Sequence, residues 1–174
     1  MSLDKGTMPE ISAGDYRFAI VASRFNKKLV DALVRDVIDT LHGSGVSSEN
    51  VRLLRVPGAA ELPHVCNMLA STDEYDAIIA LGVVIAGETP HHEIIGFSTA
   101  NALQAVAVAT TVPIINGIIV ANNRGQAEAR TIGDIRRGVE FAGAALEMAW
   151  QTALLLDEVL DAQDARESDE KKGK

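Results

Sequence analysis

The chain has 174 residues, the size of one ordinary domain, since domains usually contain about 100–200 residues. Apolar residues make up 47% of it and charged residues 23%, a globular composition that excludes a disordered chain or a fibrous repeat. With 16 basic against 24 acidic residues, the formal charge of −8 has the wrong sign for binding along a nucleic acid or on an anionic membrane. We therefore expect partners that are small molecules or proteins.

Cysteine use and hydrophobic runs indicate the compartment. The one cysteine, Cys66, excludes an internal disulfide framework and a cysteine-based zinc site. No apolar run reaches the roughly 18 residues of a membrane-spanning helix. The N-terminus also lacks the basic and apolar regions of a signal peptide. These features predict a cytoplasmic protein.

Apolar patterning predicts four strands that alternate with four helices. The strands are nearly continuous apolar runs, typical of strands buried on both faces, at 17–23, 51–57, 76–85 and 113–120. The helices carry apolar residues at helical spacing, at 27–43, at 62–69, from a Thr89-Pro90 start to about Thr110, and from near Asp134 to Leu160. Residues 1–15 are interpreted as a flexible arm, and 161–174 as a charged tail that frays or is disordered.

Strands that alternate with helices of this length form right-handed crossovers and a parallel sheet covered on both faces. We therefore predict a single α/β domain over 16–160, a three-layer α/β/α fold with a four-stranded parallel sheet in flavodoxin-like order. In such sheets the ligand crevice lies beyond the carboxyl ends of the strands. The segments there are SRFN (23–26), VPGAAELP (56–63), AGETPHHE (86–93) and ANNRGQAEAR (121–130).

The AGETPHHE segment has the most unusual chemistry. Gly87 allows a close backbone approach, and the free amides at a helix start attract an anion such as phosphate, provided that Glu88 turns away. The alternative is an ordinary capped helix start. The positive end of the helix favours the neutral form of His91 and His92, which can then accept a proton; the alternative is a pair of surface histidines. Adjacent side chains on a helix point apart, so we expect no metal site.

Three further side chains each have two interpretations. Phe25 would be a stacking platform if exposed and core filler if buried, and by itself core filler is favoured. Glu61 suits a carboxylate that accepts hydroxyl hydrogen bonds, or an acidic residue favoured by the helix dipole. Arg130, in a small basic cluster, would bind phosphate or pair with Glu128 or Asp134.

Several common motifs are absent from the sequence. No GxGxxG follows the first strand and no GxxxxGK[ST] occurs, which removes the main support for dinucleotide-binding and P-loop proteins. No GxSxG occurs either, and Cys66 lies within an apolar helical stripe, so a serine or cysteine hydrolase is weakly supported.

Taken together, the segments resemble the lumazine synthase family, the 6,7-dimethyl-8-ribityllumazine synthases of riboflavin biosynthesis. The resemblance covers roughly 17–155 in order. It is carried by SRFN, by VPGAAELP in place of VPGAFEIP, by LGVVIAGETPHHE in place of GxVIRGxTxH, and by RRG-VEFAGAALEMA in place of KG-xEAAxxALEM.

The resemblance implies an enzyme that condenses 5-amino-6-(D-ribitylamino)uracil with 3,4-dihydroxy-2-butanone 4-phosphate and releases phosphate, without metal or organic cofactor. It further implies that Phe25 stacks on the pyrimidine and that His91 transfers protons. The other substrate-binding residues would be Ala59, Ala60, Glu61, Val83, Val84, Ile85 and Asn116. Phosphate would be held by Glu88, Thr89, Arg130 and Arg137. Asn116 and Arg130 would come from a neighbouring subunit of a homo-oligomer, a pentamer or an assembly of pentamers.

Differences from the family pattern keep a second function open. Ala60 and Asn116 stand where the family often has Phe, and Ala86 stands where it has the Arg of VIRG. Arg137 replaces the usual Lys and keeps its charge. The alternative is a non-catalytic ligand-binding or shell-forming relative. An unrelated flavodoxin-like nucleotide binder is the third possibility.

Overall fold

The structure is a computed structural model that describes Ile11 and residues 13–172. Within this part, residues 164–172 are described by their backbone alone. The predicted arm at 1–15 therefore lies mostly outside the described residues. Where the arm is described, Ala13 is fully buried and Ile11 packs against the core, so this end of the arm belongs to the domain.

A four-stranded parallel sheet forms the middle layer, as predicted. Its strands are β1 (Phe18–Ser23), β2 (Val51–Val56), β3 (Ala77–Ile85) and β4 (Ile114–Ala121), in the order β2-β1-β3-β4. All six residues of β1 are buried, because layers of side chains cover both faces of this central strand. The order matches the first four strands of a flavodoxin-like sheet.

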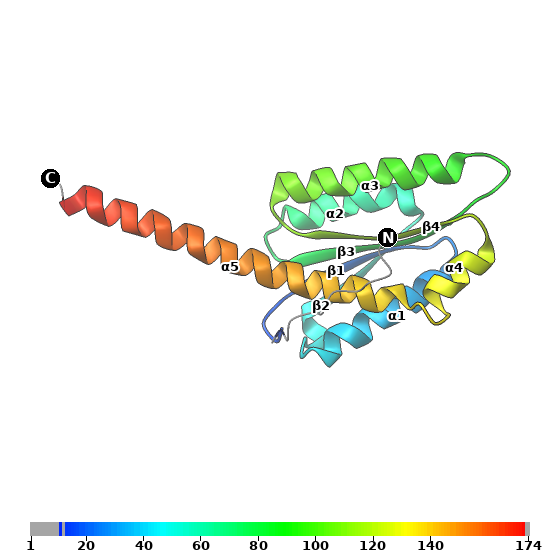
Figure 1. The fold of residues 1–174 in the computed structure, drawn as a ribbon, viewed down its shortest axis with the longest axis horizontal. Coiled ribbons are helices and arrows are strands. Elements are labelled where there is room, and N and C mark those ends of the chain that lie inside the picture. Colours follow the sequence, from blue (N-terminus) through cyan, green and yellow to red (C-terminus); the bar gives the residue numbers. More distant parts are fainter. Residues whose placement is uncertain (1–10, 12, 173–174) are drawn as a thin grey trace.

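Helices cover the two faces of the sheet (Figure 1). One face carries α1 (Lys27–Gly43), α4 (Arg124–Thr131) and α5 (Arg137–Lys172). The other carries α2 (Leu62–Ala70) and α3 (His91–Thr110). Each face has its own buried apolar cluster, one centred on Phe18, Leu33 and Leu146 and the other on Val21, Cys66 and Leu103. The three-layer α/β/α prediction is confirmed.

The helices differ from the prediction more than the strands do. Helix α4 was not predicted, because its polar sequence buries only Ala127 and Thr131 and has no apolar stripe. Helix α5 begins at Arg137 rather than near Asp134. It continues as helix through Lys172 and extends away from the sheet, so the described part of the tail at 161–172 is helical rather than frayed or disordered (Figure 1).

The strand order places a crevice at one end of the sheet. The chain leaves β1 toward β2 on one side, whereas β3 lies on the other side of β1. At such a reversal the connections after the strands diverge and leave a gap at the carboxyl ends. The segments after β1, β2 and β3 all reach this end of the sheet.

Candidate active site

A pocket of about 390 Å³ lies at the carboxyl ends of β1 and β3, and we call it the strand-end pocket. It joins segments that are far apart in the sequence. Its lining residues are Phe25, Asn26, Gly58, Ala59, Ala60, Glu61, Val83, Val84, Ile85, His91 and Ile95. The structure thus brings together the predicted residues from the first three strand ends.

Phe25 is an exposed ring on the turn after β1. Its exposed fraction is 71%, so the interpretation as core filler is wrong. The next residue, Asn26, has a left-handed backbone with φ of 52°, a conformation that Asn tolerates better than most residues. The Asn26 side chain donates a hydrogen bond from Nδ2 to the carbonyl oxygen of Val83, at 2.8 Å. This bond fixes the Phe25 turn against β3.

Glu61 ends a 3₁₀ turn, Ala59–Glu61, that leads into α2. Its Oε2 accepts a hydrogen bond from the backbone N–H of Gly58 at 2.7 Å, so the carboxylate caps this turn. It also lines the pocket and is exposed. The absence of a side chain at Gly58 leaves room for Phe25, because a Cβ there would lie 3.3 Å from Cδ2 of the ring.

Strand β3 extends past β1 and presents backbone to the pocket. The register pairs β1 with β3 only as far as Leu81, whereas β4 pairs with β3 as far as Ile85. The β1-facing edge of residues 83–85 therefore borders the pocket. Backbone N–H and C=O groups on such an edge can form hydrogen bonds with polar atoms at the rim of a flat ligand.

The two adjacent histidines of α3 have different surroundings. His91 lines the pocket, whereas Nδ1 of His92 lies 3.4 Å from the carbonyl oxygen of Thr89. The helix begins at His91 with Pro90 as its N-cap, one to two residues after the predicted Thr89-Pro90 start. Glu88 and Thr89 are exposed in the preceding loop and are not among the residues lining the strand-end pocket.

The remaining predicted residues lie in a second pocket of about 250 Å³ beside the edge strand β4, which we call the edge pocket. Its lining residues are Asn116, Ile118, Ile119, Val120, Arg130, Arg137 and Phe141. Within one chain, Asn116, Arg130 and Arg137 are thus grouped with one another but not with Phe25 or His91.

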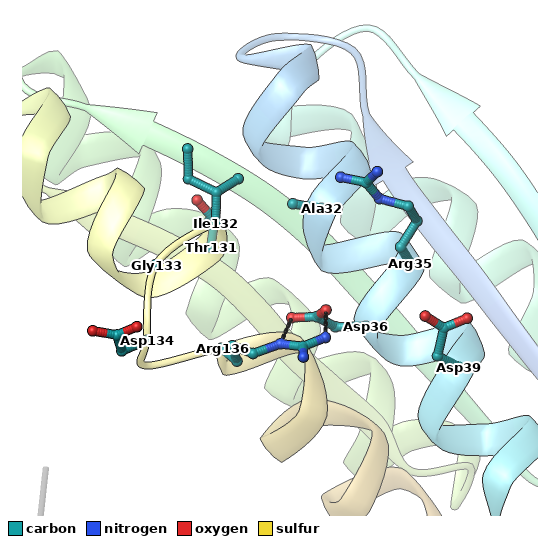
Figure 2. Close-up of a pocket in the computed structure, with 9 residues that line it drawn as sticks. All are labelled: Ala32, Arg35, Asp36, Asp39, Thr131, Ile132, Gly133, Asp134 and Arg136. Atoms are coloured by element: carbon teal, nitrogen blue, oxygen red, sulfur yellow. Dashed lines mark hydrogen bonds and ion pairs between the residues drawn. The ribbon is translucent and has the colours of Figure 1, made fainter.

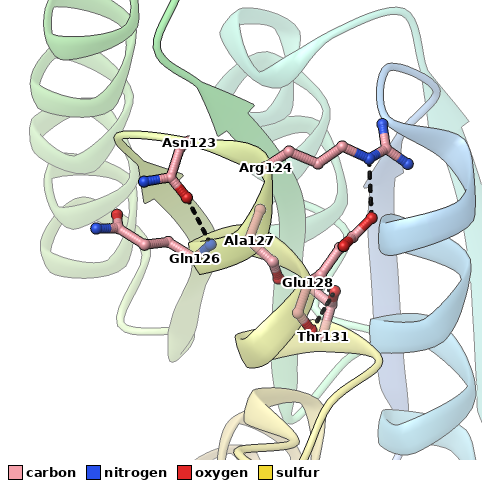
Figure 3. A network of polar contacts seen from close by, with 6 residues as sticks. All are labelled: Asn123, Arg124, Gln126, Ala127, Glu128 and Thr131. Carbon is pink, nitrogen blue, oxygen red and sulfur yellow. Dashed lines mark hydrogen bonds and ion pairs between the residues drawn. The ribbon is translucent and has the colours of Figure 1, made fainter.

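Arg130 lies in the last turn of α4, a helix whose other polar contacts are shown in Figure 3. Asn123 caps the helix by accepting a hydrogen bond from the backbone N–H of Gln126 at 2.9 Å. Arg124 pairs with Glu128 at 2.8 Å, and Arg130 Nη1 donates to the carbonyl oxygen of Gln126 at 3.0 Å. Among the described residues Arg130 forms no ion pair with Glu128 or Asp134.

The described residues also bear on metal and nucleophile chemistry. They contain no group of three or more His, Cys, Asp or Glu side chains arranged to hold a metal ion. Burial raises the pKa of the Cys66 thiol to about 12, so it stays protonated and unreactive at neutral pH. None of the described helices is both long enough and apolar enough to span a membrane.

Comparison with known proteins decides the family. The family model described as 6,7-dimethyl-8-ribityllumazine synthase matches residues 15–152. The chain belongs to this family. A protein of that name from Nitrosospira multiformis is 41% identical over 81% of this chain and 86% of its own length. Another from Methylobacillus flagellatus is 37% identical over 80% of this chain and 91% of its own length. The predicted resemblance is confirmed, and an unrelated nucleotide binder is excluded.

Of the residues that differ from the lumazine synthase pattern, Ala60, Asn116 and Arg137 line the two pockets, whereas Ala86 lines neither. Ala60 lines the strand-end pocket and Asn116 the edge pocket, where Oδ1 of Asn116 accepts a hydrogen bond from the N–H of Ile118 at 3.1 Å. Arg137 lies in the edge pocket and pairs with Glu140 one turn along α5. The positive charge predicted at 137 is therefore held in place by a carboxylate.

The sequence-based prediction did not include Asn26 and Ile95, which also line the strand-end pocket. Asn26 had a usable signal, because it follows Phe25 at a strand end and Asn is enriched in left-handed turns. Ile95 had none, since its α3 position is one of many apolar positions in that helix.

Proposed function

We propose that this protein condenses 5-amino-6-(D-ribitylamino)uracil with 3,4-dihydroxy-2-butanone 4-phosphate, giving 6,7-dimethyl-8-ribityllumazine and phosphate. Membership of the lumazine synthase family, which serves riboflavin biosynthesis, is the starting point. One observation carries the proposal: an exposed aromatic ring, a strand edge not paired with β1, a carboxylate and a histidine converge on one pocket. These groups suit a flat, hydroxylated substrate that must exchange protons.

The strand-end pocket is the proposed pyrimidine site. Phe25 stacks on the ring, and its exposure leaves the aromatic face available. The backbone of Val83, Val84 and Ile85 meets the polar groups of the pyrimidine. Ala59, Ala60 and Glu61 bind the ribityl chain and the ring edge, and the exposed Glu61 can accept hydroxyl hydrogen bonds while it caps its turn.

Two features are the proposed phosphate ligands. The start of α3 offers backbone N–H groups and the positive end of the helix dipole near Glu88 and Thr89. Glu88 is exposed, which leaves its carboxylate free to turn toward water and away from the anion. Arg130 and Arg137 add two guanidinium groups from the edge pocket.

His91 is the proposed proton-transfer residue. The reaction joins an amine to a ketone, eliminates phosphate and closes a ring, so protons move at several steps. Holding the two substrates together can supply an effective concentration of about 10⁵ M or more, and a positioned histidine typically adds about 10²-fold or more. His92 lies against the Thr89 carbonyl and has no such role.

A complete site then needs two copies of the chain, because the two pockets lie apart in one copy. We propose a homo-oligomer, a pentamer or an assembly of pentamers, in which Asn116 and Arg130 serve a neighbour's strand-end pocket. Exposed apolar side chains on α3, including Ile94, Phe97 and Val108, support a contact between copies. Light scattering would contradict this if it found an 18.5 kDa monomer at micromolar concentration.

The proposed reaction is tested by mixing the two substrates with the purified protein and following the absorbance of the lumazine. Formation of product at a rate proportional to enzyme supports the proposal. The second candidate is a non-catalytic relative that binds ligand or forms a shell, favoured by Ala60, Ala86 and Asn116 in place of the family's residues. Binding of the pyrimidine without product formation would establish that second function instead.

A further inference from the structure

A groove of about 610 Å³ separates α1 from the loop that connects α4 to α5, and one ion pair crosses it (Figure 2). Arg136 donates from Nε to Oδ2 of Asp36 at 3.4 Å and from Nη2 to Oδ1 of the same carboxylate. The guanidinium thus engages both oxygens, which fixes direction as well as distance. The two residues are 100 positions apart in the sequence.

Both partners occupy unfavourable positions that the ion pair offsets. Arg136 has a left-handed backbone with φ of 44°, which is strained for a residue that has a Cβ. The Asp36 residue is only 7% exposed, and a buried carboxylate without a partner strongly destabilises a fold. Because the ion pair offsets both of these costs, the loop has one strongly preferred position on α1.

The paired loop leads directly into the edge pocket. Arg136 immediately precedes α5, whose first residue, Arg137, lines that pocket. The start of α5 also packs tightly on α1, since a Cβ at Gly138 would lie 2.5 Å from Cβ of Asp36 and 2.8 Å from the Leu33 carbonyl oxygen. Fixing the position of Arg136 on α1 therefore also fixes the position of Arg137.

The other end of α1 borders the strand-end pocket. The helix begins at Lys27, directly after the turn that holds Phe25 and Asn26. A single rigid helix thus connects the proposed ring site to the loop before Arg137.

We propose that the Asp36–Arg136 ion pair is a positioning device that fixes the start of α5 on α1 and so aims Arg137 at its anion. Neither Asp36 nor Arg136 lines either pocket, so the pair acts through Arg137. The inference rests on the proposed function for the identity of the anion, the phosphate of the four-carbon substrate. A purely structural anchor would instead lower stability and affect both substrates alike.

The test uses Arg136→Gly, which removes the ion pair while glycine accepts the left-handed backbone without strain. We expect the KM for the butanone phosphate to rise roughly five- to tenfold, as expected for a misplaced binding group, with the pyrimidine KM and kcat within about twofold of the parent. Arg136→Lys keeps the charge and should restore part of the loss. Equal changes in both KM values, or none, would overturn the proposal.

Two further variants make this test specific. Arg55→Ala breaks a different ion pair of α1, between Arg55 and Asp31 at 2.6 Å, which connects the helix to β2 rather than to the loop. It should leave both KM values near those of the parent, and a selective phosphate effect in this variant would overturn the proposal. If Arg136→Gly does not fold because Asp36 is left charged, the double variant Asp36→Asn with Arg136→Gly removes that charge and should show the same selective rise.

Calorimetry with inorganic phosphate separates this inference from the proposed function. If the parent forms no lumazine, the proposed reaction fails, but phosphate binding still reports on the anion site. We expect Arg136→Gly to bind phosphate more weakly than the parent, and Arg137→Ala to bind it more weakly still. Equal affinity in parent and Arg136→Gly, or no phosphate binding by the parent, would overturn the positioning role.

Discussion

The strand-end pocket and the edge pocket use different physical means of recognition. The first is built where three loops meet, and its described lining offers an aromatic face, a strand edge and one histidine but no arginine or lysine. The second lies on an edge strand and contributes two arginines. A flat ring is held by shape and backbone groups, whereas an anion needs a positive charge. We therefore expect that ligand binding in each pocket can be weakened without weakening binding in the other.

The largest effect is expected for a substitution at His91, where kcat should fall and the pyrimidine KM should not change. His91→Ala should lower kcat by about 10²-fold or more, because the variant loses a positioned proton-transfer group. The pyrimidine KM should stay nearly unchanged, since Phe25 still holds the ring. Steady-state kinetics measures both constants, and His92→Ala is the matched control. Equal losses in the two variants would show that His91 has no special role.

Arg130→Ala tests the edge pocket. The KM for the butanone phosphate should rise about 10- to 150-fold, equivalent to the roughly 1.5–3 kcal/mol of a hydrogen bond to a charged group. Inorganic phosphate should compete in the parent and much less in the variant. Arg124→Ala, on the same helix, removes an exposed arginine that pairs with Glu128 and should leave this KM unchanged. A change in the pyrimidine KM instead would make Arg130 structural.

Phe25→Ala tests ring binding in the strand-end pocket. The pyrimidine KM should rise about tenfold, within the roughly 1–3 kcal/mol that stacking of a base on an aromatic side chain contributes. The unfolding temperature should hardly change, because the ring is mostly exposed. Met68→Ala on α2 removes a comparably exposed side chain, 59%, and serves as the control. A large loss of stability would show that Phe25 supports the fold rather than the ligand.

The smallest effect is expected for a substitution that adds to the pocket. Ala60→Phe restores the aromatic residue that the family often has and should lower the pyrimidine KM about two- to tenfold, since an aromatic pair contributes roughly 0.5–1.5 kcal/mol. The KM for the butanone phosphate should stay constant. If the pyrimidine KM rises, the added ring blocks the pocket, and Ala60 is part of this protein's own substrate fit.

The layered fold was predictable because its signals are local. The four strands are apolar runs, and their predicted bounds agree with the structure within one residue at each end. Helix α1 has a clear apolar stripe, whereas α4 has none and was missed. The helical stretch at 161–172 was missed because its charged composition resembles that of a disordered tail.

The site was only partly predictable because burial and long-range pairing depend on the whole fold. The motifs identified Phe25, Glu61 and His91 as members of one crevice, and the structure brings them together. The exposure of Phe25 could not be read from its apolar character. The Asp36–Arg136 pair joins residues 100 positions apart with no shared motif, so no local pattern could indicate it.

The hydrogen bond from Asn26 to Val83 has a consequence for how ligands arrive. With the neighbouring N–H of Arg24 bonded to the Val56 carbonyl at 2.9 Å, the backbone on both sides of Phe25 is fixed in the free protein. The turn that carries the ring is therefore preorganised, and fixing the backbone of a residue on binding would otherwise cost about 1–2 kcal/mol. Association with a flat ligand should therefore need no slow ordering of this turn before the rings stack.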